Sequence, residues 1–168
     1  MKLPRLLLSL LVVLFSLASV APAQAMTTFT AHLTGAGEVP ARDTAAQGQA
    51  IFQLSKDGTE LRYRLIVANI TNVTASHIHL GAEDVNGPVV VSLYGGVAAS
   101  GRIDGVIATG TITAADLTGP LAAQPLSALL DQMEAGNTYV NVHTNDGVAP
   151  TNTGPGDFPG GEIRGQLG

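Results

Sequence analysis

Three of the four histidines in the chain are placed where they could bind one metal ion. His77 and His79 are separated by a single residue, in Ser76-His77-Ile78-His79. On a strand, residues two apart point to the same face and lie about 7 Å apart, so both imidazoles can lean towards a shared ion. His143 follows in Tyr139-Val140-Asn141-Val142-His143, near the end of another predicted strand. If the two strands meet, the sequence predicts a site with three nitrogen ligands.

The ion at such a site would be a transition metal. Three neutral imidazoles suit Cu²⁺ or Zn²⁺, and copper has the higher intrinsic affinity. Three protein ligands leave a coordination position open, and His32, on the polar face of the first predicted strand, is a candidate for it. The alternative is structural, because a His-x-His pair is a weak signal and imidazoles also serve as hydrogen-bonded scaffold groups. His32 can equally be a solvated strand residue.

Composition excludes several other kinds of chemistry. The 168 residues include 13 acidic and 8 basic ones, and the formal net charge of −5 argues against a nucleic-acid partner. The chain has no cysteine, which excludes disulfides and thiolate metal sites. It also lacks a Gly-x-Ser-x-Gly nucleophile motif and a glycine-rich phosphate loop. We therefore expect a binding role more than an enzymatic one.

The first 25 residues have the pattern of an export signal. Lys2 and Arg5 precede an apolar run from Leu6 to Val20, and Ala23-Gln24-Ala25 supplies the small residues of a cleavage site. The run is too short to cross a bilayer comfortably. We predict a signal peptide over residues 1–25 and one domain over residues 26–168, exported to the periplasm or the cell exterior, with no membrane span after cleavage.

The elements that must position the histidines are predicted to be strands. Period-two alternation of apolar and polar residues dominates the chain, as in Leu61, Tyr63, Leu65 and Val67 against Arg62 and Arg64. The predicted strands are Thr27–Thr34, Gly48–Leu54, Glu60–Ala68, Val73–Leu80, Pro88–Tyr94, Gly105–Thr113, Thr138–Thr144 and Glu162–Leu167. Gly, Pro, Asn and Asp turn signals separate them. About eight short strands at this spacing predict an all-β sandwich or barrel.

Two segments depart from the strand pattern. Leucines and a methionine at helical spacing after Ser127, ended by Gly136, predict one short helical connection, and Thr113-Ala114-Ala115-Asp116 can cap a further single turn. The stretch Asn145–Gly161 is rich in Gly, Pro, Asn and Thr. It is either a mobile surface loop or a loop that shapes a site near His143.

Five segments together resemble the CHRD domain family, named after chordin and found in bacterial exported proteins. They are Phe29–Pro40, Ala75–Gly81, Asn86–Val91, Tyr139–Thr144 and Pro159–Gln166, in family order. The resemblance implies an immunoglobulin-like or superoxide-dismutase-like β-sandwich and says little about activity. Two departures stand out: the connection Asn145–Phe158 is longer than usual, and His32 replaces a small or hydroxylated residue.

Three functions remain open at this point. The first is binding of copper, with zinc as the alternative, through His77, His79 and His143 for storage, delivery or sensing. The second is an extracellular interaction module with structural histidines and a protein partner. The third is a dismutase-like, metal-dependent oxidoreductase, although the chain lacks the dismutase disulfide and its full ligand set cannot be matched.

Overall fold

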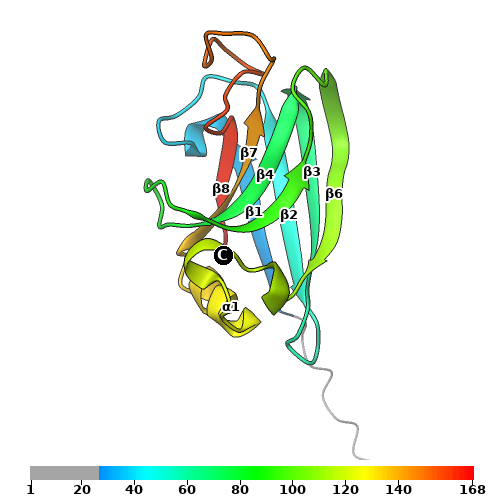
Figure 1. Cartoon of the computed structure of the whole chain (residues 1–168), viewed down its shortest axis with the longest axis vertical. Helices are drawn as coiled ribbons and strands as arrows, with labels where there is room; N and C mark the ends of the chain where they lie inside the picture. Colours follow the sequence, from blue (N-terminus) through cyan, green and yellow to red (C-terminus); the bar gives the residue numbers. More distant parts are fainter. Residues whose placement is uncertain (1–26) are drawn as a thin grey trace, which may run out of the picture.

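The computed structural model describes residues 27–168, so the predicted signal peptide lies outside the described residues. Eight strands and one α-helix make up the domain (Figure 1). The strands are β1 (Thr28–Thr34), β2 (Gln47–Leu54), β3 (Leu61–Thr71), β4 (Val73–Leu80), β5 (Val89–Gly95), β6 (Arg102–Ile112), β7 (Thr138–Thr144) and β8 (Ile163–Gln166). Helix α1 (Leu126–Glu134) and three 3₁₀ turns, η1 (Gly35–Gly37), η2 (Ala114–Asp116) and η3 (Gly119–Leu121), complete the chain.

The strands form one sheet in the order β5-β4-β7-β8-β1-β2-β3-β6, and every neighbouring pair is antiparallel. The sheet curls until its two edge strands, β5 and β6, come into contact. The Tyr63 hydroxyl helps to close it by donating a 2.7 Å hydrogen bond to the Leu93 carbonyl. The all-β sandwich or barrel-like fold with a short helical connection is therefore confirmed.

The apolar core lies inside the curled sheet. It consists of the inward-facing side chains of each strand, among them Phe52, Leu65, Ile78, Val140 and Ile163, all at most 1% exposed. Helix α1 covers one end of this core, and Figure 1 shows it at the opposite end of the sheet from the long loop that follows β7. The predicted cap at Thr113 is also present, as a reciprocal capping box with Asp116 at η2.

Most strand boundaries agree with the prediction, and the largest difference is between β3 and β6. Strand β3 continues past its predicted end to Thr71, and strand β6 begins before its predicted start, at Arg102. Their pairing contains two register shifts, and Asn69 in β3 has a φ of 57°. Such bulges interrupt the alternation of apolar and polar residues, so period-two reasoning ends each strand where the bulge begins.

The opposite face of β4, β7 and β8 is also buried, under three loops that we call the covering loops: residues 38–46, 81–88 and 145–162. The side chains between this face and the loops are mostly polar. Those at most 8% exposed include Glu38, His79, Asn141, Asp157, Glu162 and Arg164. This polar layer contains the predicted site. Within residues 27–168, no helix is long and apolar enough to cross a membrane.

Candidate metal centre

The sheet brings His77, His79 and His143 together, because β4 and β7 are neighbours. His77 lies opposite Asn141 and Ala75 lies opposite His143, so His143 is diagonal to His77 on the same face. One ring nitrogen from each histidine lies within 4.8 Å of the others. Around a tetrahedral ion with bonds of about 2.0–2.1 Å, nitrogens are about 3.3 Å apart. Small rotations of the rings would therefore close the group around an ion.

Backbone carbonyls fix the orientation of two of these rings. His79 Nδ1 donates to the Gly87 carbonyl at 2.8 Å, and His143 Nδ1 donates to the Pro159 carbonyl at 2.9 Å. Because a carbonyl can only accept, each ring carries its proton on Nδ1 and presents the lone pair of Nε2. His77 Nδ1 donates to His143 Nε2 at 3.1 Å, because the His143 proton is on Nδ1 and its Nε2 can only accept. A carbonyl on the far nitrogen of each ring is the usual outer partner of metal-binding histidines.

All three imidazoles are held neutral. Burial lowers the pKa of His77 to about 4, and the neighbouring His143 and His79 add to the effect. Burial also lowers the pKa of His79 and of His143, against the opposing effect of their carbonyl partners. Neutral imidazole is the form that binds a metal. At neutral pH the cluster would therefore bind an ion without first releasing protons from the rings.

A stack of side chains supports His79 from the neighbouring strands. The Tyr139 ring on β7 lies parallel to the His79 ring, with centroids 4.8 Å apart, and the Arg164 guanidinium lies 3.4 Å from the Tyr139 centroid. Arg164 also donates to the carbonyls of Ala82 and Val85, at 3.0 and 3.1 Å. Arg164 thereby ties the last strand to a carbonyl-rich loop. The same loop supplies the Gly87 carbonyl to His79.

Glu162 holds the long loop in place beside His143. Its buried carboxylate accepts hydrogen bonds from the hydroxyls of Thr44 and Thr144 and from the Gly156 amide, at 2.6, 2.7 and 2.8 Å. These bonds join the first and third covering loops to β7. They fix the segment that delivers the Pro159 carbonyl to His143, so the loop after β7 shapes the site.

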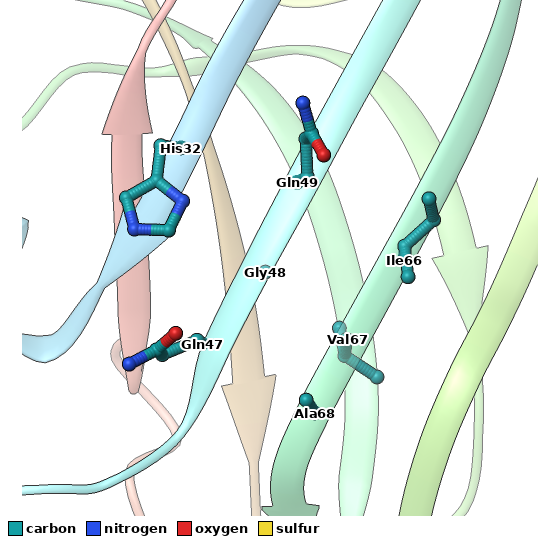
Figure 2. Close-up of a pocket in the computed structure, with 7 residues that line it drawn as sticks. All are labelled: His32, Gln47, Gly48, Gln49, Ile66, Val67 and Ala68. Atoms are coloured by element: carbon teal, nitrogen blue, oxygen red, sulfur yellow. The ribbon is translucent and has the colours of Figure 1, made fainter.

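His32 does not belong to the cluster. His32 is exposed on β1, and β7 and β8 lie between β1 and β4 in the sheet. Among the described residues, the group that could hold a metal ion consists of His77, His79 and His143. Figure 2 shows its ring beside Gln47 and Gln49 of β2, in a shallow pocket that Ile66 and Ala68 of β3 complete. The register places His32 on the same outward face of the sheet as His77, but the strand order separates β1 from β4 by β7 and β8.

A family model for the CHRD domain matches residues 29–167. The chain belongs to the CHRD domain family. A comparison with curated proteins gives no match, and neither does a comparison with solved structures. The five segments that carry the resemblance in this CHRD domain meet in one place. Glu38, His77, His79, Gly87, Asn141, His143, Pro159 and Arg164 all belong to them and all contribute to the polar layer around the histidines.

Two residues of this layer are missed by the sequence analysis. Asn141 shares a face with His143 by period two, a signal that was available. Glu38 gives no such signal, because it follows η1 and reaches β7 only through the fold. Burial raises the pKa of the Glu38 carboxyl to about 7, although Arg164 and Arg42 partly oppose this. This carboxyl group, enclosed beside Asn141, can therefore be neutral or charged near neutral pH.

Proposed function

We propose that this CHRD domain is an exported protein that binds a transition-metal ion through His77, His79 and His143. Copper is the favoured ion and zinc the alternative, and the role is storage, delivery or sensing of the metal. One observation carries the proposal. Two of the three rings donate from Nδ1 to backbone carbonyls, which leaves an Nε2 lone pair on each, and one nitrogen of each of the three rings lies within 4.8 Å of the others.

A purely structural cluster would account for these rings less well. A structural histidine normally uses both ring nitrogens when it is buried, because an unpaired buried acceptor costs about 1–3 kcal/mol. His79 is 8% exposed, and its Nε2 atom is buried with no hydrogen-bond partner in the described part of the chain. A metal ion would satisfy this lone pair.

The donor set supports copper over other ions. Three imidazoles without a thiolate or a carboxylate suit copper and zinc, and the affinity order of divalent metals places copper first. Zinc fits the same ligands with a tetrahedral arrangement and one further position. His77 and His143 are only partly buried, so an ion from solution could reach their nitrogens.

The test is metal analysis of residues 26–168, purified without an affinity tag. The protein is exposed to equimolar copper and zinc, desalted and measured by elemental analysis. We expect about one metal per chain, lost in His77→Ala and in His143→Ala and retained in His32→Ala. Circular dichroism and thermal unfolding of each metal-free variant show whether it is folded.

Two outcomes would overturn the proposal. A folded wild-type chain without metal would make the three histidines part of the scaffold, and the extracellular interaction module would become the leading function. Uptake that survives in folded His143→Ala would place the metal elsewhere on the chain. Retention in His143→Ala and loss in His32→Ala would move the site to β1.

A further inference from the structure

Asn141 occupies the middle of the histidine cluster. In the sheet it lies directly opposite His77 on β4 and directly opposite Arg164 on β8. It precedes His143 by two residues on β7, so all these side chains share the face beneath the covering loops. Asn141 is 3% exposed, and its Oδ1 atom is buried without a hydrogen-bond partner among the described residues. The polar end of the side chain is therefore enclosed with the imidazoles.

Two buried acceptors face one another here. The Asn141 side chain is close enough to His79 to influence the pKa of that ring. His79 Nε2 carries a lone pair, because the proton of this ring is on Nδ1, and Asn141 Oδ1 is a carbonyl oxygen. Two acceptors cannot satisfy each other, and buried polar atoms without a partner are rare in native proteins. A cation between them would satisfy both at once.

Glu38 orients the Asn141 amide. Its carboxyl group is 6% exposed and lies close enough to Asn141 for the amide to stabilise the charged form. In its ionised form the carboxylate only accepts hydrogen bonds, so it favours the orientation in which the amide nitrogen faces Glu38 and Oδ1 faces the histidines. Gly161 makes room for this carboxyl, because a Cβ atom there would collide with it, and its φ of 126° also requires glycine.

We infer that Asn141 Oδ1 is the fourth protein ligand of the ion held by His77, His79 and His143, with Glu38 as its positioning residue. The inference rests on the proposed function and specifies the donor set as three nitrogens and one oxygen. An amide oxygen is a harder ligand than imidazole, so this set favours divalent copper or zinc over monovalent copper. It also makes the centre a fully protein-bound one, which suits holding a metal more than reacting at it.

The experiment compares Asn141→Leu and Asn141→Asp with the wild-type chain and with the control Asn137→Leu. Leucine keeps the approximate volume and removes the oxygen, whereas aspartate keeps an oxygen ligand. Asn137 is half-buried next to β7 and bonds only to Gln132 through its side chain, at 3.3 Å. Dissociation constants for copper and zinc are measured by competition with a chelating indicator, and the coordination number is followed by the visible spectrum of the cobalt-loaded protein.

We expect Asn141→Leu to weaken metal binding by about tenfold or more, the value of one well-made buried interaction. Its cobalt spectrum should change, while Asn141→Asp and Asn137→Leu should keep the wild-type affinity within a few-fold. In the metal-free state Asn141→Leu should lose some stability, because Glu38 loses its amide partner, so stability does not separate the two roles. A purely structural asparagine predicts an unchanged affinity and an unchanged cobalt spectrum.

The positioning role of Glu38 has its own readout. Glu38→Met should alter the cobalt spectrum and weaken binding, and Glu38→Gln should restore part of both because its amide can still pair with Asn141. An effect on stability alone, with the spectrum unchanged, would remove Glu38 from the inference.

A measurement on the unmodified chain covers the case in which Asn141→Leu does not fold. Zinc binding should shift the side-chain amide resonances of Asn141 and leave those of Asn137 in place.

If the wild-type chain binds no metal, the proposed function fails. If it binds metal and Asn141→Leu has the same affinity and spectrum, or the Asn141 amide does not shift, the three-histidine centre stands. The two acceptors are then bridged by a water molecule and Asn141 is not a ligand.

Discussion

Removing one hydroxyl group tests whether the covering loops position the histidines of the proposed metal centre. Tyr139 Oη accepts a 3.1 Å hydrogen bond from the Gly87 amide, and the Gly87 carbonyl in turn holds His79 Nδ1 at 2.8 Å. Tyr139→Phe keeps the ring that stacks on His79 and removes only this anchor. We predict that the variant binds copper or zinc more weakly because Gly87, and with it the His79 ring, is held less firmly.

The size of the effect follows from the one bond that is lost. A neutral hydrogen bond at a half-buried backbone group contributes about 1 kcal/mol to stability. If that free energy is fully transmitted to the orientation of His79, the dissociation constant rises about fivefold. Loss of a direct outer partner of a metal-binding histidine commonly weakens binding by about 10- to 100-fold, but the Gly87 carbonyl is still present in this variant, so about fivefold is the upper bound. The free energy of unfolding of the metal-free protein should fall by about 1 kcal/mol.

The matched control is Tyr63→Phe, which removes a comparable bond far from the histidines. Tyr63 donates to the Leu93 carbonyl at 2.7 Å, between β3 and β5. Both variants should lose about 1 kcal/mol in urea unfolding, and only Tyr139→Phe should change the dissociation constant measured with a competing chelator. Equal dissociation constants for the two variants would refute the idea that Gly87 positions His79 for the metal.

Four further predictions concern the groups around the three histidines. The metal-free protein should lose stability as the pH falls from about 6.5 to about 4, because folded His77 has a pKa of about 4 and takes up its proton later than the unfolded chain does. Glu38, with its raised pKa of about 7, opposes this trend as the pH falls from 7 to 4.5, so urea midpoints should show a steeper loss in Glu38→Gln. Glu162→Gln should destabilise the fold by about 3 kcal/mol in chemical denaturation, since an amide nitrogen replaces an oxygen that accepts buried hydrogen bonds. Arg164→Lys should speed hydrogen exchange in residues 82–87 and lower stability by about 2 kcal/mol, because an ammonium group cannot reproduce the planar contacts to two carbonyls and the Tyr139 ring.

The sequence predicts the strands well because burial on one face imposes period-two alternation. It also places His77 and His79 on one face, since both lie on β4 with one residue between them. The sequence does not predict that β4 pairs with β7, because no local pattern specifies which strands pair. His32 illustrates this: it has the same strand context and the same outward orientation, yet the sheet order separates it from the cluster. The side-chain spacing within a strand is a local property, and the pairing of strands is a global one.

The partners that complete the centre are largely backbone groups, which explains why residue types gave little warning of them. The carbonyls of Gly87 and Pro159 hold two of the histidines, and neither depends on a side chain. The contribution of the sequence is to determine the backbone conformation of the loops. At position 87 this requires glycine, because a Cβ atom there would collide with the Leu80 carbonyl oxygen. Substitution of the exposed residues Glu83 and Asp84 in the same loop should therefore leave the centre intact, whereas Gly87→Ala should disrupt it. The centre is specified less by a set of ligand residues than by the backbone geometry that orients them.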